Sequence, residues 1–215
     1  IEALWNISPK HARAVWGSVG GEKFWYNLRG YDIPETGTNT TTIGHSRVLD
    51  PSLRNPAAAR LVARRLTVKA ASRLRRKEFY ATRFHFSSRT ADGYKWEAEA
   101  RLPPSQDNFA FLHALDDLWT AMIVDAAPQT LKKVSIAFHG LCRRDQITPD
   151  LFDTSSETCQ KLARKNETLS RAMDTLNEKY GAETLKLGIS PQTQAGYVGT
   201  KIAFSRIPDA AEFWE

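Results

Sequence analysis

Eleven cationic side chains that could bind phosphate lie between Pro51 and Ala91, where Glu78 is the only acidic residue. This segment has a net charge of +10, whereas the rest of the chain, with 19 basic and 23 acidic residues, has −4. Phosphates are attracted to such a field and release counterions when they bind, so the pattern favours a polyanionic partner such as nucleic acid. A long solvated basic helix is the alternative. The basic residues are Arg54, Arg60, Arg64, Arg65, Lys69, Arg73, Arg75, Arg76, Lys77, Arg83 and Arg89.

The residues that could support catalysis or bind a metal show no suitable spacing. Metal-dependent polymerases and nucleases need carboxylates that converge on the ion. Asp116 and Asp117 form the only close acidic pair, but adjacent residues on a helix point in different directions. The five histidines lack the i, i+4 spacing of metal ligands, and the sequence shows neither a nucleophile elbow nor a phosphate-binding glycine loop. We expect no catalytic residue, no metal site and no cofactor in this chain.

The composition indicates a soluble globular protein. The chain has 215 residues, of which 41% are apolar and 25% charged. Cys142 and Cys159 form no disulfide or metal pattern, which is typical of reduced thiols in the cytosol. Neither a membrane-spanning run nor a signal segment is visible. Because the chain begins at Ile1, it looks like a piece of a longer protein.

Helical and strand periodicities alternate along the chain. Two short helices are expected within residues 4–30, and an extended linker over 31–41. Strand patterns at 42–49, 80–89, 94–102 and 131–141 alternate with helical patterns at 55–77 and from Asp107 or Ser105 to Pro128, and Pro103–Pro104 should end the third strand. This β-α-β-β-α-β order predicts an α+β fold, a split four-stranded sheet with two helices on one face.

The remaining residues should form an appendage. A helix is expected at about 156–179, followed by short strands at 184–188 and 201–205. The expected domain organisation is a helical region at 1–30, a linker at 31–41, a sheet domain at 42–152 and a C-terminal extension at 153–215.

The alternation predicts which side chains lie on the free face of the sheet, since the aromatic side must meet the helices. Glu97 and Glu99 also fall on this face, so their strand should lie away from nucleic acid, or the register differs. His45 could share the face with His85 and His139. The polar residues expected there are Arg83, His85, Ser87, Arg89, Lys95, Arg101, Lys133, Ser135 and His139.

The segment Gln146–Phe152 (QITPDLF) resembles a peptide that binds in a groove. It has one amide, Gln146, and two apolar anchors, Leu151 and Phe152, after the last predicted strand. The alternative is a loop whose Leu151 and Phe152 fold back onto the core.

Three segments, in order, resemble the Y-family (translesion, UmuC and polymerase IV-like) DNA polymerases. Residues 16–32 (WGSVGGEKFWYNLRGYD) look like the end of their thumb, and residues 42–49 (TIGHSRVL) like the start of their little finger. Residues 169–181 (LSRAMDTLNEKYG), with TLKLG at 184–188 and FSRIP at 204–208, are similar to the tail of UmuC-type bacterial members.

The resemblance implies the non-catalytic, DNA-binding part of a nucleotidyltransferase that acts in lesion bypass and DNA repair. The family's catalytic carboxylates, which use Mg²⁺, lie on a palm domain that nothing here matches. The partners implied are duplex or primed DNA, held through phosphates across the major groove, and a sliding clamp bound by Gln146, Leu151 and Phe152. A cytoplasmic, nucleoid-associated location is also implied. The implied DNA-binding residues are Gly44, His45, Ser46, Arg47, Arg83, His85, Arg89 and His139.

Two other functions fit the same order of elements. An RNA-recognition motif has this layout but stacks bases on aromatic residues of its free face, whereas Phe84, Phe86 and Trp96 are predicted to face the helices. A protein-interaction scaffold would use the basic helix to bind an acidic partner.

Overall fold

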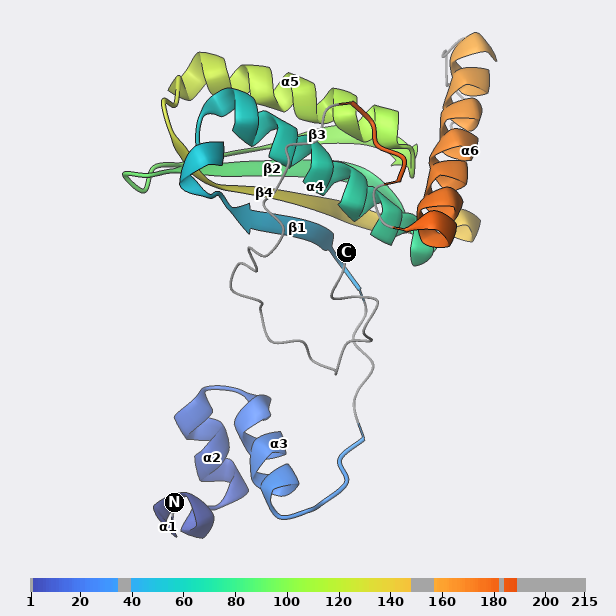
Figure 1. Ribbon diagram of the computed structural model, residues 1–215. Coiled ribbons are helices and arrows are strands. Elements are labelled where there is room, and N and C mark those ends of the chain that lie inside the picture. The colour runs from blue at the N-terminus through green and yellow to red at the C-terminus, as the bar shows by residue number, and fades with distance from the viewer. Residues whose placement is uncertain (1, 35–39, 148–156, 182–183, 189–215) are drawn as a thin grey trace. The chain divides into compact units, whose positions relative to one another are not determined.

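The computed structural model describes residues 2–34, 40–147, 157–181 and 184–188 and divides the chain into two compact units, Ile1–Asn39 and Thr40–Glu215 (Figure 1). Part of the predicted linker, at 35–39, lies outside the described residues. None of the helices in the described ranges is long and apolar enough to cross a membrane.

The N-terminal unit contains three short helices, α1 (Glu2–Asn6), α2 (Pro9–Trp16) and α3 (Val19–Leu28). Helix α2 begins as predicted: the Ser8 hydroxyl accepts a hydrogen bond from the His11 amide at 3.3 Å, and Pro9 occupies the first turn. A side chain at Gly21 would collide with the Ala12 carbonyl, so glycine lets α3 pack closely on α2. Helix α1 was not predicted from the sequence.

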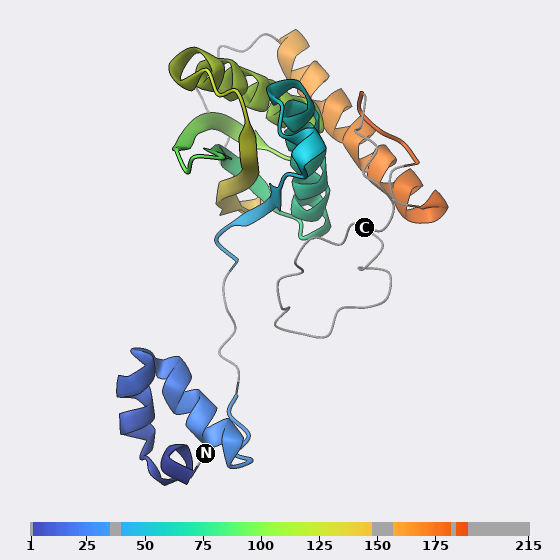
Figure 2. The ribbon, with the colours of Figure 1, turned by 60° about the vertical axis from the view of Figure 1, so that its left-hand side comes forward.

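The second unit is built on a four-stranded antiparallel sheet in the order β1-β4-β2-β3. Its strands are β1 (Ile43–Val48), β2 (Tyr80–Thr90), β3 (Lys95–Ser105) and β4 (Leu131–Cys142). Helix α4 (Pro56–Arg76) packs against β1 and β4, and α5 (Asn108–Ala126) against β3 and β2, both on the same face (Figures 1 and 2). The predicted α+β fold with the β-α-β-β-α-β order is therefore confirmed. A 3₁₀ turn, Pro51–Leu53, links β1 to α4.

Both long helices begin at the polar residues expected to cap them. The Asn55 side chain accepts from the Ala58 amide at 2.8 Å, and the Asp107 carboxylate from the Phe109 amide at 2.6 Å. Each cap satisfies an amide that has no partner within its helix and contributes about 1 kcal/mol.

Strand β3 differs from the prediction, because it continues through Pro103 and Pro104 to Ser105. Proline cannot donate a ladder hydrogen bond, but β3 is an edge strand, where one side of the backbone needs no partner. The register also shifts between Ala81 and Arg83 of β2, so this end of β3 is irregular. The prediction that the prolines end the strand was wrong for this reason.

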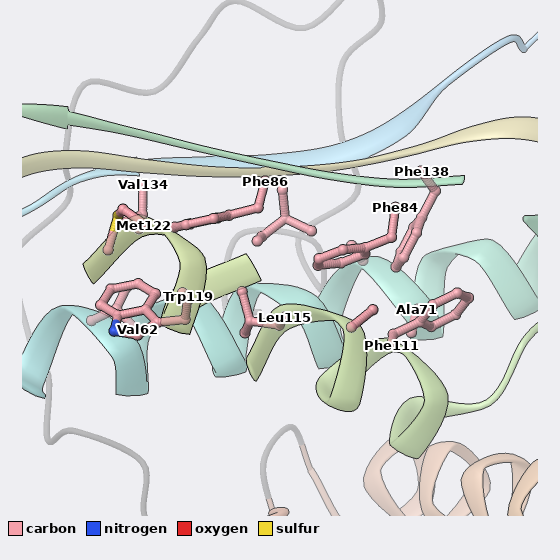
Figure 3. Packing of buried hydrophobic residues seen from close by; sticks show 14 of the residues in the cluster. Val62, Ala71, Phe84, Phe86, Phe111, Leu115, Trp119, Met122, Val134 and Phe138 are labelled. Atoms are coloured by element: carbon pink, nitrogen blue, oxygen red, sulfur yellow. The ribbon is translucent and has the colours of Figure 1, made fainter. Parts of the chain in front are cut away.

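The core lies between the sheet and the two helices. Phe84, Phe86 and Phe138 point from the strands toward Phe111 and Trp119 of α5 (Figure 3). The rings of Phe111 and Phe138 lie 4.3 Å apart, and those of Phe86 and Trp119 5.4 Å apart. Burial of each phenylalanine contributes about 2–3 kcal/mol, so this aromatic layer fixes which face of each strand points toward the helices.

Helix α6 (Glu157–Tyr180) is attached to the sheet domain by polar contacts around Arg75, whose side chain is only 3% exposed. Its guanidinium donates to both Asp174 oxygens, at 2.6 and 2.9 Å, and also to the Gln106 carbonyl at 2.6 Å and Asn108 Oδ1 at 3.0 Å. The buried Ser170 hydroxyl accepts from the Asn108 amide at 3.1 Å. These contacts join α4, the start of α5 and α6, and we call them the Arg75 clamp.

The chain beyond α6 differs from the prediction where it is described. Residues 184–188 form bends instead of the expected short strand. The Asn177 side chain bonds both the amide and the carbonyl of Leu185, at 2.7 and 3.1 Å, so this backbone is held by α6 rather than by another strand. The second expected strand, at 201–205, lies outside the described residues.

Candidate nucleic-acid interface

One face of the sheet is covered by neither α4 nor α5. Burial alternates along β2, where Phe84 and Phe86 are fully buried while Arg83 and Arg89 are exposed and His85 is half-buried. In antiparallel pairs, residues directly opposite each other point to the same side, so the register extends this face across the sheet. All polar residues predicted for the face on β2, β3 and β4 lie on it, including Glu97 and Glu99.

The basic residues of the free face form two rows across the strands. In the first cationic row, Arg89 lies opposite Lys133 of β4 and Lys95 of β3. In the second, Arg83 lies opposite His139 of β4 and Arg101 of β3. Arg83 and Arg89 are six positions apart on β2, which places the two rows about 20 Å apart along the strand.

The zone between the rows is small and polar. Ser87 lies opposite Ser135 and Glu97, and His85 lies opposite Ala137 and Glu99. Both glutamates form ion pairs with basic side chains of the free face. Glu97 lies 2.6 Å from Lys95 Nζ, and Glu99 lies 3.7 Å from an Arg83 nitrogen. The Lys95 hydrogen bond lowers the pKa of Glu97. Strand β3 pairs directly with β2 in the register that the alternation predicted, so Glu97 and Glu99 lie beside the cations of the free face. The position of β3 relative to nucleic acid stays a prediction.

Two histidines lie at the middle of the face. The rings of His85 and His139 are 5.9 Å apart and nearly perpendicular, and His85 Nε2 lies 3.4 Å from a Glu97 oxygen. Partial burial, and then the charge of His85, lower the pKa of His139. His139 is therefore mostly neutral at pH 7 and adds positive charge to the second cationic row only in acid.

Strand β1 divides its predicted site residues between the two faces. Gly44 lies opposite Ala137 and Ser46 opposite Ser135, on the free face. His45 and Arg47 lie opposite Ile136 and Val134, on the helix side of the sheet. The expectation that His45 shares the free face with His85 and His139 is corrected, and Arg47 pairs with Asp50 at 3.3 Å near the sheet edge.

Gly44 has a structural reason to be glycine. A side chain there would lie well within van der Waals distance of the Ile136 carbonyl oxygen, which belongs to the paired backbone of β4. The absence of a side chain at Gly44 thus serves the pairing of β1 with β4.

The +10 segment does not map onto the free face. Of its eleven basic residues, Arg83 and Arg89 lie there, whereas the others lie on α4 or beside its ends. Arg60 and Arg64 both bind Asp116 of α5, at 3.0 and 2.8 Å, and Arg75 is buried in its clamp. The net charge of the segment therefore overestimates the positive charge on the free face of the sheet. Instead, five cations and two glutamates give the free face a net charge of +3.

The acidic pair on α5 is used in structural contacts. Asp116 binds the two arginines of α4, and Asp117 lies 3.1 Å from His113 Nδ1 on its own helix. In the described ranges, no group of three or more His, Cys, Asp or Glu side chains could hold a metal ion.

The predicted clamp-binding segment is described only at its start. Gln146 ends a 3₁₀ turn, Arg144–Gln146, and its Oε1 accepts from the Arg143 amide at 2.9 Å. Leu151 and Phe152 lie outside the described residues, so the clamp interaction stays a prediction.

Three cations of the two rows were absent from the DNA-binding residues that the resemblance implied. Lys95, Arg101 and Lys133 follow the same period-2 alternation as Arg83 and Arg89, and that pattern alone placed them on the face. The residues that the resemblance implied lie on β1 and β2, with His139 alone on β4 and none on β3.

The chain matches a model of the C-terminal domain of the impB/mucB/samB family over residues 40–151. Among solved structures, it is similar to a Y-family DNA polymerase chimera of Dbh and Dpo4, with a TM-score of 0.44 and 8% identity over 65% of this chain. It is also similar to an insertion ternary complex of Dbh DNA polymerase, with a TM-score of 0.43 and 8% identity over 66% of this chain. The match spans 40% of each of those polymerase chains. The comparison with curated proteins finds no match.

The family match covers the whole sheet with α4 and α5, from before β1 to beyond β4. It accounts for just over half of the chain. The chain therefore belongs to the impB/mucB/samB family of Y-family DNA polymerases and carries their C-terminal domain.

Proposed function

We propose that this chain is the DNA-binding part of a translesion polymerase and that its free sheet face holds the template–primer duplex through backbone phosphates. The observation that carries the proposal is the pair of cationic rows, which a family match alone would not require. Polymerase chemistry and a role in DNA repair belong to the proposed whole protein, whose catalytic carboxylates and Mg²⁺ would lie outside this chain.

The spacing of the rows fits a duplex presenting its major groove. That groove is about 12 Å wide, and the phosphates lie outside its opening on both sides. Rows about 20 Å apart can therefore each reach one backbone while the sheet spans the groove between them. Lysine and arginine contacts to phosphates position a duplex without reading its sequence.

The zone between the rows supports the same arrangement. Glu97 and Glu99 would repel phosphates, but over the middle of a groove they meet base edges and water instead. Each also holds a neighbouring cation, Lys95 or Arg83, in place. We expect binding without base preference.

Replacing Arg83 and Arg89 together by alanine tests the proposal, because it removes the central cation of each row. We expect the affinity for duplexes of different sequence to fall alike, by about 10- to 100-fold at moderate salt, as about two phosphate contacts are lost. Fluorescence anisotropy with labelled primed duplexes measures the effect.

Arg60→Ala is the matched control, since it removes an arginine whose partner is Asp116 on the helix side. It should leave DNA affinity within about twofold, as expected for an exposed pair remote from the face. Unchanged binding by the double variant, or a loss confined to some sequences, would contradict phosphate binding by the two rows.

The RNA-binding alternative is less well supported. The buried rings of Phe84, Phe86 and Trp96 all lie on the helix side, so the strand positions of the free face provide no aromatic side chain except histidine. Stacking of single-stranded bases therefore lacks its usual platform. Tighter binding of single-stranded RNA than of duplex DNA would favour the alternative.

We also propose that Gln146, Leu151 and Phe152 bind a sliding clamp, on the strength of the sequence pattern alone. Replacing Leu151 and Phe152 by alanine should abolish clamp binding in a pull-down while leaving duplex affinity unchanged. Retention of clamp binding by that variant would count against it.

A further inference from the structure

Helix α6 carries a line of exposed leucines. Leu162, Leu169 and Leu176 are spaced by seven residues, so they lie on one side of the helix. Their side chains are 55%, 46% and 39% exposed, whereas Met173, on the neighbouring line, is only 7% exposed. Single exposed leucines are ordinary on a protein surface, but a line of them indicates an interaction site. We call these three residues the leucine row.

The chain that follows α6 adds to this apolar surface. The Asn177 side chain, next to Leu176, holds the backbone of Leu185 through two hydrogen bonds. Leu185 is itself 40% exposed. The chain that continues beyond residue 188 therefore starts from a segment that α6 anchors.

Two lysines border the leucine row on the side away from the sheet domain. Residues three positions apart are neighbours on a helix surface, so Lys165 lies beside Leu162 and Lys179 beside Leu176. On the other side of the row lies Met173, which is buried where α6 contacts the domain. We call Lys165 and Lys179 the lysine border.

The lysine border argues against a second copy of the chain as the occupant of the leucine row. If α6 paired with its counterpart in a two-fold antiparallel arrangement, the lysine borders of the two helices would face each other and repel. A DNA backbone is also a poor occupant, because phosphates bind cationic and hydrogen-bonding groups rather than leucines. A suitable occupant presents apolar side chains beside acidic ones.

Residues 209–215 (DAAEFWE), which lie outside the described ranges, have that composition. Three acids and no basic residue give the segment a net charge of −3. At helical spacing the acids fall on one face, whereas Phe213 and Trp214 fall on another together with the two alanines. We propose that residues 209–215 bind the leucine row, with the aromatic rings on the leucines and the carboxylates toward the lysine border.

The connection within the chain makes even a weak contact effective. Twenty residues separate Gly188 from Asp209, and a flexible chain of that length spans about 25 Å. The leucine row is about 21 Å long, so the segment can reach it. Such a tether gives an effective concentration on the order of 1 mM, at which a contact with an intrinsic Kd of about 0.1 mM is about 90% formed.

Disulfide cross-linking of the full chain tests this contact. In a chain whose two native cysteines are replaced by serine, Ala211→Cys is combined with Ala172→Cys, an exposed position between the leucine row and the lysine border. The control combines Ala211→Cys with Glu178→Cys, which is exposed and, nine residues from Leu169, lies on the opposite side of α6. We expect the disulfide within one chain to form about tenfold faster with Ala172→Cys than with the control.

Phe213→Ser with Trp214→Ser should abolish that preference, because the rings no longer bind the leucines, and circular dichroism verifies the fold of each variant. Equal rates at the two positions of α6 would overturn the inference, as would a preference that survives the loss of both rings. A disulfide between two chains at Ala172→Cys, seen as a dimer on a non-reducing gel, would instead assign the leucine row to a second copy. The contact is independent of DNA binding, so duplex affinity should be the same in all of these variants.

Discussion

Arg75 shows how a single buried charge can determine where a helix packs. Its guanidinium has one carboxylate partner in the Arg75 clamp, Asp174, which α6 supplies. Removing one member of a buried pair leaves the other charge uncompensated, which costs about 3–5 kcal/mol. We expect Asp174→Ala to lower the Tm of the sheet domain by about 10 °C, at roughly 2–4 °C per kcal/mol.

Differential scanning calorimetry measures that shift, and Glu178→Ala, an exposed position on the same helix, is the control that should leave the Tm unchanged. Equal stability of the two variants would show that α6 is not held by the clamp.

The histidine pair gives DNA binding a pH dependence with a defined sign. His139 faces His85 and Arg83 of β2 and, more distantly, Glu99 of β3; Gly44 and Ser46 of β1 carry no charge. Its pKa is depressed in the folded protein, so below the ordinary histidine pKa the unfolded chain binds more protons and stability falls as pH falls. The free folded protein thus favours the neutral His139 ring, whereas bound DNA phosphates would favour the protonated ring.

Duplex affinity should therefore rise by several-fold between pH 7.5 and pH 5.5, and His139→Gln should flatten the rise. Anisotropy titrations at constant ionic strength measure it. An identical rise in the variant would assign the effect to other groups.

At the residue scale, alternation predicted the free face of β2, β3 and β4 because buried aromatics fix those strands. It did not settle β1, where His45 was expected on the free face but lies on the helix side, as does Arg47, which the resemblance alone implied. Because β1 is an edge strand, its polar side chains can point to the helix side and still reach water. The pairing of Asp116 with Arg60 and Arg64 was likewise missed, since spacing within one helix does not show which helix lies beside it.

At the element scale, the β1–β4 pairing depends on Gly44. A methyl group there would meet the Ile136 carbonyl, and backbone cannot move aside as a flexible side chain can. We expect Gly44→Ala to destabilise the sheet domain by about 1–3 kcal/mol, the usual range for overpacking. Chemical denaturation measures the change, with Ser46→Ala on the same strand as the control. A neutral Gly44→Ala variant would mean that β1 can shift.

Most elements were predictable because their boundaries are marked locally: Asn55 and Asp107 cap the helices, and the four strands alternate. The errors arose where tertiary context decides. Prolines end a central strand but not the edge strand β3, and residues 184–188 have a strand-like composition but bond to Asn177 of α6.

At the scale of the whole molecule, charge is distributed on two surfaces that the sequence merges into one segment. Five cations lie on the free face, whereas nine of the eleven basic residues of the +10 segment lie on α4 or beside its ends. If the free face alone contacts a blunt duplex, the logarithm of the binding constant should fall with the logarithm of salt concentration at a slope of about −4.5. Titrations from low to moderate salt measure it. A slope near zero would exclude electrostatic binding, and a much steeper slope would mean that cations outside the free face also contact the duplex.

The family match ends at residue 151, whereas the Arg75 clamp reaches Asp174. Recombinant fragments trimmed to the homologous boundary would leave a guanidinium without its counter-ion in the interior, and we expect them to express poorly and aggregate. For crystallisation or NMR, fragments of the sheet domain should therefore extend at least through Tyr180.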